Sequence, residues 1–129
     1  MYNRTYEQLL TYSHDGAAMV AKAALAVRPR LLGDESAAAL AETFKVLGDT
    51  TRVRILDALA RAELCVGDVA ELLGLTESAV SHQLRLLRGM RLVRPRRDGR
   101  LIFYSLDDHH IVRLFEQGLE HVEERGRRP

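Results

Sequence analysis

Apolar residues recur at three- and four-residue intervals near the C-terminal end of the chain, between residues 108 and 124. This spacing places them on one face of an α-helix, as a stripe that another apolar surface must cover. The stripe consists of Ile111, Leu114, Phe115, Gly118 and Val122. The pattern therefore predicts an amphipathic helix over 108–124, in which Gly118 would let a second backbone approach closely.

The same periodicity predicts two scaffold helices in the first half of the chain. The first runs from its N-cap, Ser36, to Gly48-Asp49, and the second begins at Thr50 or Thr51. Their residues expected to face inward are Ala39, Leu40, Phe44, Leu47, Val53, Ile55, Leu56 and Leu59.

Residues 66–87 have the pattern of a helix-turn-helix. Ala70 is small where two helices would cross, and Gly74 can adopt the left-handed turn conformation that follows. Val80 is expected to pack back into the core. Thr76 is expected to cap the second helix, which in this motif is the helix that reads DNA.

A β-hairpin is predicted over residues 92–106, because Asp98-Gly99 is a strong turn signal between two extended arms. Pro95 lacks an N–H and confines the first arm to an edge strand. A two-stranded ribbon after a helix-turn-helix is a wing. The fold class predicted is therefore mostly α with a β-hairpin wing, a winged helix-turn-helix.

The 129 residues suit one folded domain at 35–129, preceded by an N-terminal arm and helix at 1–34. The longest apolar run, 17–27, is interrupted by Lys22 and is too short to cross a bilayer. We therefore expect a cytoplasmic protein without a membrane partner. The single cysteine, Cys65, excludes an intrachain disulfide.

Charge is distributed unevenly, although the net charge is only +1. Residues 85–100 contain seven arginines and one acidic residue, Asp98, whereas 107–124 is acidic. Such a basic patch fits the phosphates of double-stranded DNA, although a solvated helix face remains the alternative. Gln83 and Arg85 would suit bidentate contacts with adenine and guanine. The expected DNA-binding residues are Thr76, Ser78, Ser81, His82, Gln83 and Arg85 on the helix, and Arg96, Arg97 and Arg100 on the wing.

His110 and His121 lie on the same side of the predicted C-terminal helix, because eleven residues are about three turns. They are separated by about 16 Å along the axis, whereas a zinc ligand lies about 2 Å from its ion. One helix therefore cannot close a metal site. Against an antiparallel second copy, His110 would meet His121 of the partner and Asp108 would come near Glu124, giving two tetrahedral sites per dimer. Spacing alone leaves open that Asp107 and Asp108 only cap the helix and that the histidines are solvated.

Several of these segments resemble the ArsR/SmtB family of metal-sensing winged-helix repressors, and in particular the SmtB-type zinc sensors. They are ELCVGD, TESAVSHQLR, DHHIV and LEHVEE, and the similarity extends over about residues 36–125. The resemblance implies a homodimer, joined through its N-terminal and C-terminal helices, that occupies an inverted-repeat operator without metal. Metal binding would then release the genes for metal efflux or sequestration.

The family's C-terminal metal site falls on Asp108, His110, His121 and Glu124, the same set that the spacing indicates. Two imidazoles and two carboxylates suit Zn(II) and also Co(II). The resemblance further implies that the outer ring nitrogen of His121 bonds to backbone near the end of the recognition helix, which we place at Met90 or Arg91.

A second metal site of the family matches Cys65 and Asp68, with His14 as a candidate ligand from the partner's arm. The arm has no cysteine, so any site there would hold zinc weakly. Gly67 stands where arsenic-type members carry a further thiol, which argues against an arsenite sensor.

Three other functions remain to be weighed against metal sensing. A winged-helix repressor could sense oxidant or persulfide through Cys65, which with one thiol per chain requires an intermolecular or mixed disulfide. An enzyme is not expected, because four protein ligands would close the metal shell and no pair of nucleophile and base stands out. No small-molecule substrate is expected either. A metal-storage or structural dimer would differ from a repressor in failing to bind DNA.

Overall fold

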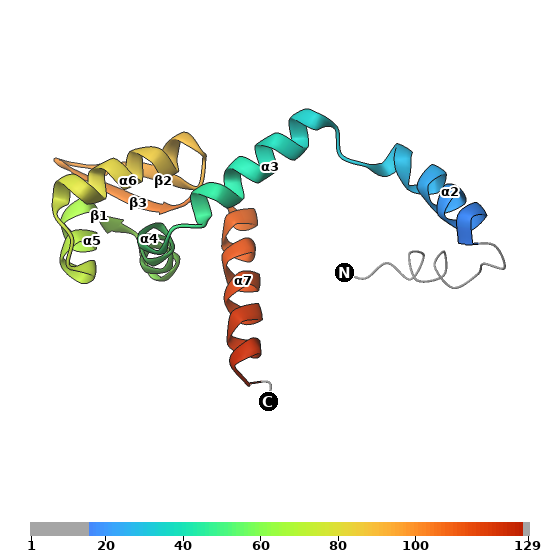
Figure 1. The fold of residues 1–129 in the computed structure, drawn as a ribbon. Helices are drawn as coiled ribbons and strands as arrows, with labels where there is room; N and C mark the ends of the chain where they lie inside the picture. The colour runs from blue at the N-terminus through green and yellow to red at the C-terminus, as the bar shows by residue number, and fades with distance from the viewer. Residues whose placement is uncertain (1–15, 128–129) are drawn as a thin grey trace. The chain divides into compact units, whose positions relative to one another are not determined.

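The computed structural model describes residues 16–127, and Figure 1 shows their elements. In chain order these are α2 (Gly16–Val27), the 3₁₀ turn η1 (Arg28–Arg30), α3 (Asp34–Leu47), α4 (Thr50–Arg61), β1 (Leu64–Cys65), α5 (Val66–Leu73), α6 (Glu77–Gly89), β2 (Val93–Asp98), β3 (Leu101–Leu106) and α7 (His109–Arg127). The chain divides into two compact units within α3, between Leu40 and Ala41.

The first unit contains α2, η1 and the first half of α3, and most of its described side chains are exposed. Helix α3 begins at Asp34, earlier than the sequence predicts, because the Gly33 carbonyl accepts a hydrogen bond of 3.0 Å from the N–H of Ala37. Ser36 therefore lies inside the first turn and is not the N-cap. Ala39 and Leu40, expected to face inward, are exposed.

The second unit has a core built from α4, α5, α6 and the base of the sheet, with Val46 from the end of α3. The buried residues are Val46, Ile55, Leu56, Leu59, Val69, Ala70, Val80, Leu84, Leu87, Leu92, Val93 and Leu106. Ile55, Leu56 and Leu59 face inward as predicted, whereas Val53 is 41% exposed and Phe44 53% exposed. These two lie on an apolar surface that the core does not cover.

The helix-turn-helix forms as its sequence predicts. Helix α5 ends at Gly74, whose φ of 67° is in the left-handed region. The hydroxyl of Thr76 accepts a hydrogen bond of 3.1 Å from the N–H of Ala79 and caps α6. Ala70 and Val80 are both buried where α5 and α6 pack together. The turn chemistry of Gly74 and Thr76 thus fixes how α6 leaves α5.

The sheet has three strands in the order β1-β3-β2, one more than predicted. The extra strand, β1, pairs Leu64 with Tyr104 and Cys65 with Phe103. In the hairpin, Asp98 pairs with Leu101, so the turn residues are Gly99 and Arg100 and not Asp98-Gly99. Gly99 has φ 61°. Strand β2 is an edge strand, as Pro95 requires.

The end of α6 is joined by hydrogen bonds to the start of α7. Beyond α6, the N–H of Leu92 donates to the Leu87 carbonyl and that of Arg91 to the Arg88 carbonyl, both at 2.9 Å. This Schellman arrangement places Arg91 at φ 56°, a position that favours glycine. The carbonyl of Leu92 accepts a bond of 3.0 Å from the N–H of Asp107, two residues before α7 begins.

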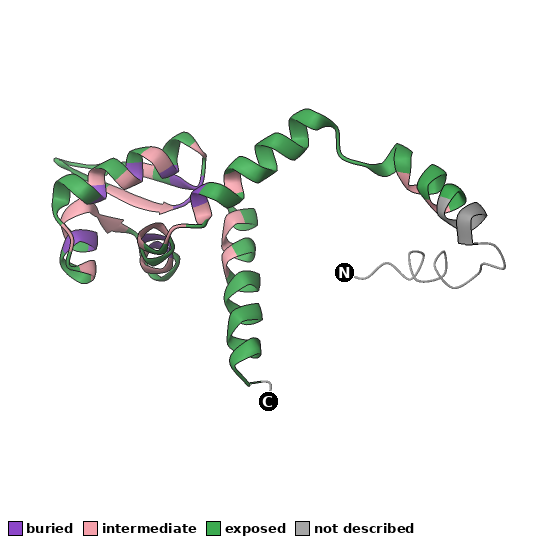
Figure 2. Cartoon of the chain, viewed as in Figure 1, coloured by how far each residue is buried: buried purple, intermediate pink, exposed green. Residues whose placement is uncertain are grey.

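Helix α7 differs from the helices of the core, because none of its residues is buried. Figure 2 shows it as exposed along most of its length, with half-buried residues near its first turns. Ile111, Val112 and Phe115 pack against the core, whereas Leu114 is 38% exposed and Val122 56% exposed. The predicted apolar stripe is therefore present but only partly covered by its own chain.

Candidate functional site

The recognition helix α6 buries Val80, Leu84 and Leu87 in the core, and its opposite face is exposed to solvent. The residues predicted to contact DNA from this helix do not all share that face. Thr76, Ser78, His82 and Arg85 are exposed, whereas Ser81 and Gln83 are half-buried.

Gln83 is engaged by a residue from another helix. Its side-chain carbonyl oxygen accepts a hydrogen bond of 3.0 Å from Nε of Arg52, which lies on α4. The same guanidinium donates through Nη1 to the main-chain carbonyl of Val46 at 3.2 Å. Arg52 was not among the residues that the sequence singled out. It stands 31 positions before Gln83, and no local pattern connects the two.

The wing arginines also differ from one another. Arg97 and Arg100 are exposed near the tip of the hairpin. Arg96 donates to Oε1 of Glu63 through Nε at 2.9 Å and Nη2 at 2.6 Å. Its guanidinium carbon also lies 5.3 Å from the centre of the Phe103 ring. Arg96 therefore ties the wing to the segment before β1, whereas Arg97 and Arg100 have no comparable ion pair with any residue between 16 and 127.

The pairing of Arg96 with Glu63 shifts the pKa values of both side chains. The hydrogen bond from Arg96 lowers the pKa of Glu63, and the same bond raises the pKa of Arg96. Both groups therefore stay charged throughout the neutral range, and this surface ion pair is expected to weaken as salt is added.

A cleft with a volume of about 480 Å³ lies between α6 and the wing. Arg85 and Arg88 from α6 and Arg100 from the hairpin turn line it, with Glu77 as the acidic member. Arg88 was not predicted as a DNA-binding residue, although its position three residues after Arg85 places both on one helix face. Three guanidinium groups around one cleft form a surface suited to phosphate oxygens.

Asp108 caps α7, which was one of the two readings left open by the sequence. Its Oδ1 accepts hydrogen bonds from the N–H groups of His110 at 2.8 Å and Ile111 at 3.2 Å. The bond from Ile111 is the largest cause that lowers the pKa of Asp108. The other oxygen, Oδ2, lies 3.4 Å from Nδ1 of His110. One carboxylate oxygen thus caps the helix while the second lies beside the imidazole.

The other two predicted metal ligands, His121 and Glu124, are exposed further along α7. Among residues 16–127, the structure contains no group of three or more histidine, cysteine, aspartate or glutamate side chains that could hold a metal. A single chain therefore brings Asp108 and His110 together but does not assemble all four predicted ligands.

Half of the second predicted metal site is also present. Cys65 is half-buried at the N-cap position of α5, and its thiol donates to Oδ2 of Asp68 at 3.2 Å. The third candidate ligand, His14, lies outside the described residues.

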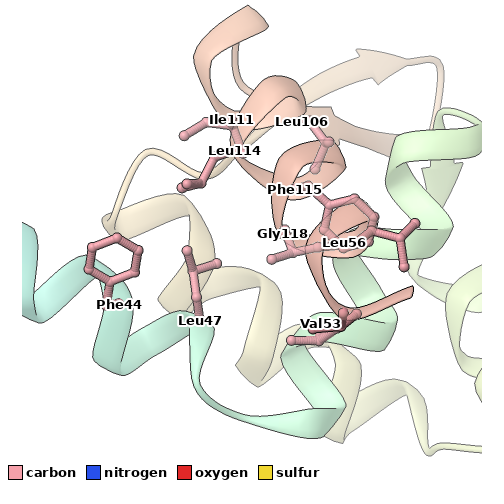
Figure 3. Close-up of a pocket in the computed structure, with 11 residues that line it drawn as sticks. Phe44, Leu47, Val53, Leu56, Leu106, Ile111, Leu114, Phe115 and Gly118 are labelled. Carbon is pink, nitrogen blue, oxygen red and sulfur yellow. The ribbon is translucent and has the colours of Figure 1, made fainter. Parts of the chain in front are cut away.

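An apolar groove with a volume of about 320 Å³ is formed by the second half of α3, α4 and α7 (Figure 3). Its walls are Phe44, Leu47, Val53, Leu56, Leu106, Ile111, Leu114, Phe115, Gly118, Leu119 and Val122. Every one of these is apolar or glycine. Figure 3 shows Phe44 and Leu47 on one side of the opening and Phe115 and Gly118 on α7 on the other. Large exposed apolar surfaces are typical of sites where a protein contacts another molecule.

Taken together, a capped recognition helix, a basic wing and an exposed apolar groove define a winged helix-turn-helix regulator. The family model of bacterial regulatory proteins of the arsR family matches residues 49–94. The transcriptional repressor SmtB homolog of Synechocystis is 47% identical over 98 residues, which are 76% of this chain and 74% of that protein. The cadmium resistance transcriptional regulatory protein CadC homolog of Staphylococcus aureus is 42% identical over 86 residues, 66% of this chain and 71% of that protein.

Solved structures have the same fold. The homodimeric winged helix-turn-helix DNA-binding domain Mb0332 of Mycobacterium bovis, described as a possible ArsR-family regulator, superposes with a TM-score of 0.68 at 30% identity. The match covers 73% of this chain and 90% of that domain. The chain belongs to the arsR family of bacterial regulatory proteins. The predicted family and fold are confirmed, as is the expectation of a transcriptional regulator rather than an enzyme.

In residues 16–127, no helix has both the length and the apolar character needed to cross a membrane.

Proposed function

We propose that this protein is a homodimeric repressor that binds operator DNA through α6 and the wing, and that releases DNA when Zn(II) binds between the two α7 helices. The released genes would encode metal efflux or sequestration, and the protein would act in the cytoplasm. One feature of α7 carries the proposal. Its apolar stripe is incompletely covered, and two pairs of candidate metal ligands, Asp108 with His110 and His121 with Glu124, lie at its start and further along it.

The dimer is supported by the apolar groove. Leu114 and Val122 are partly exposed on α7, and a second copy of the helix would remove them from water. The M. bovis domain with the same fold is homodimeric by its description. An antiparallel arrangement of two α7 helices about a two-fold axis gives each copy the same contacts, as closed dimers require.

The candidate ligands fit Zn(II) by their chemistry. His110 and Asp108 have side chains that are 87% and 51% exposed, so neither has to leave a core to bind an ion. Oδ2 of Asp108 remains beside the His110 ring while Oδ1 caps the helix. His121 and Glu124 of the partner would complete four ligands of the types that tetrahedral zinc accepts. When bound, Zn(II) would supply two positive charges that hold the imidazole and carboxylate ligands of the two chains together.

A short run of backbone hydrogen bonds supports coupling between this site and the recognition helix. Asp107, next to the ligand Asp108, donates its N–H to the Leu92 carbonyl, and Leu92 in turn donates to Leu87 of α6. A rotation of the first turn of α7 would therefore shift the end of α6. Since the two recognition helices of a dimer must match two half-sites, a small shift weakens DNA binding.

The experiment is a zinc titration of the dimer with and without operator DNA from the region upstream of its own gene. We expect two equivalents of Zn(II) per dimer and a loss of DNA affinity as they bind. His121→Ala should bind the operator like the parent protein but keep it when zinc is added. His109→Ala is the matched control, because His109 begins α7 next to the proposed ligand His110 but is not part of the predicted set.

Two results would contradict the proposal. If zinc still releases the operator from His121→Ala, the metal site is assigned to the wrong residues. If the parent protein binds zinc tightly while remaining monomeric, the site does not lie between two chains.

A weaker second site is proposed at Cys65 and Asp68, with His14 from the partner. The 3.2 Å hydrogen bond between the thiol and the carboxylate supports it, because both groups already face one point. Cys65→Ser should then remove a low-affinity metal site without changing release of the operator by zinc. The descriptions of the SmtB and CadC homologs favour metal sensing over the alternative, in which Cys65 senses oxidants.

A further inference from the structure

The two faces of the wing carry different side chains. Successive residues of a strand point to opposite faces, and residues that pair across two antiparallel strands share a face. Arg94 and Arg96 therefore lie on one face of β2, which we call the outer face of the wing. Arg97 lies on the opposite face with its strand partner Ile102 and with Tyr104. We call this second face the cleft face, because Ile102 and Tyr104 line the cleft next to α6.

The charges of the outer face are compensated within the chain. Arg96 donates two hydrogen bonds to Oε1 of Glu63, and its Nη1 lies 3.9 Å from Oδ2 of Asp98. The hydrogen bond from Arg96 lowers the pKa of Glu63, and the positive charge of Arg94 lowers it further. The two arginines and the two carboxylates thus balance each other. A phosphate that approached this face would be repelled by carboxylates that are already in place.

The cleft, in contrast, carries positive charge that is not compensated. Arg85, Arg88 and Arg100 line it and are exposed, and none of them forms an ion pair with another residue between 16 and 127. Among the described residues of the lining, only Glu77 is acidic. Its Oε1 is the atom that a Cβ at Gly67 would meet, at 3.2 Å, so this carboxylate lies against the start of α5. Glu77 stands eleven positions before Arg88 on α6, which is about 16 Å along the helix axis.

The hydrogen-bonding groups of the cleft complement a phosphate group. A guanidinium has only N–H donors, whereas the free oxygens of a phosphodiester accept hydrogen bonds. The hydroxyls of Ser81 and Tyr104, two half-buried residues of the lining, can also donate. Arg85 shares the exposed face of α6 with Ser78 and His82. Duplex DNA that lies against this face would therefore run beside the cleft.

We propose that the cleft face of the wing, and not its outer face, binds phosphate groups of the DNA backbone, and that Arg88 is one of their ligands. The inference rests on the proposed binding of DNA by α6 and the wing. It divides the arginines of segment 85–100, which the sequence presents as one basic patch, between two surfaces. One surface binds phosphate, and the other is compensated by Glu63 and Asp98.

The first test measures binding of the metal-free dimer to mixed-sequence duplex DNA at several salt concentrations, because phosphate contacts do not depend on sequence. For each subunit that contacts DNA, Arg88→Gln should lower the affinity about tenfold and reduce the slope of log affinity against log salt by about one. Arg94→Gln is the matched control. It removes the same charge from the outer face and should leave the slope unchanged.

The second test requires no DNA and no variant. Inorganic pyrophosphate is titrated into the metal-free protein while NMR follows the Nε–H resonances of the arginines. The resonances of Arg85, Arg88 and Arg100 should shift until the site is saturated, because their guanidinium groups surround the cleft. The resonance of Arg94 should not shift. Since the parent protein is used, the result does not depend on whether a variant folds.

The two tests separate this inference from the proposed function. If pyrophosphate shifts the cleft arginines but the protein binds no duplex DNA, the phosphate belongs to a free compound, and the proposed function is wrong. If DNA binds and Arg94→Gln reduces the salt slope as much as Arg88→Gln does, the inference is wrong. A pyrophosphate titration that shifts none of the cleft arginines, or that shifts Arg94 as strongly as Arg88, would also overturn it.

Discussion

The recognition helix α6 and the C-terminal helix α7 are both amphipathic, yet only α6 has its apolar face covered. Helix α6 buries Val80, Leu84 and Leu87, each at most 1% exposed, whereas α7 buries none of its residues. The apolar face of α6 is therefore satisfied within one chain. The apolar face of α7 stays partly exposed in the single chain. The comparison shows that the core of one chain positions α6, whereas the exposed part of the α7 stripe is available for the dimer contact that we propose.

The largest effect is expected from a substitution on the buried face of α6. Leu84→Ala should lower the free energy of unfolding by about 2–5 kcal/mol, because it opens a cavity at a residue that is 1% exposed. Leu72→Ala, at 65% exposure on α5, should change it by less than about 0.5 kcal/mol. Denaturant unfolding monitored by circular dichroism measures both. If the free energy of unfolding fell equally in the two variants, Leu84 would not be a core residue.

On the partly exposed face of α7, Leu119→Asp should weaken dimerisation by about two orders of magnitude without unfolding the chain. Leu119 lines the groove and is 37% exposed, so an aspartate there is tolerated in a monomer but would be buried without a partner in the dimer. Sedimentation equilibrium measures the dissociation constant. Glu120→Gln, on the adjacent exposed position, is the matched control. A dimer unaffected by Leu119→Asp would place the interface elsewhere.

A smaller effect is expected from the wing, where the comparison is between two neighbouring arginines. Arg97→Ala should weaken binding to all DNA sequences alike and reduce the slope of log affinity against log salt by about one unit. Arg96→Ala should change that slope less, because its guanidinium is already paired with Glu63. Titrations of operator binding at several salt concentrations decide this. A larger change in Arg96→Ala would show that DNA displaces Glu63.

The smallest expected effect is at Arg91, two residues after the end of α6. Arg91→Gly should raise the free energy of unfolding by about 0.5–1 kcal/mol, since φ 56° strains any residue with a side chain. Arg85→Gly, inside the helix, should lower it by about 1 kcal/mol. Chemical denaturation of the two variants provides the test, and a loss of stability in Arg91→Gly would mean that the arginine side chain makes a compensating contact.

Local chemistry explains which parts of the fold the sequence could predict. Gly74, Thr76 and Pro95 each act through their own backbone or the next few residues, and each behaves as expected. The third strand, Leu64–Cys65, was missed because two residues show no alternation of apolar and polar positions. Ser36 was misassigned as a cap because Asp34 can begin the helix equally well.

The candidate site shows the same division between near and distant interactions. The pairing of Asp108 with His110 involves residues two positions apart and could be anticipated from the helix start. The partners of Gln83 and Arg96 stand 31 and 33 positions away in the sequence, so local spacing could not predict either pair. Residue type predicted which bonds these side chains could make, but only the packing of distant helices and strands decides which bonds they do make.

The two-residue strand β1 has a consequence for the cost of DNA binding. Because it pairs with Phe103 and Tyr104, the base of the wing is held on both sides of its central strand, and only the tip from Asp98 to Ile102 extends past that support. Ordering a flexible backbone costs about 1–2 kcal/mol per residue. In the DNA complex that we propose, only the tip of the wing would bear that cost, because strand pairing already holds the rest of the wing.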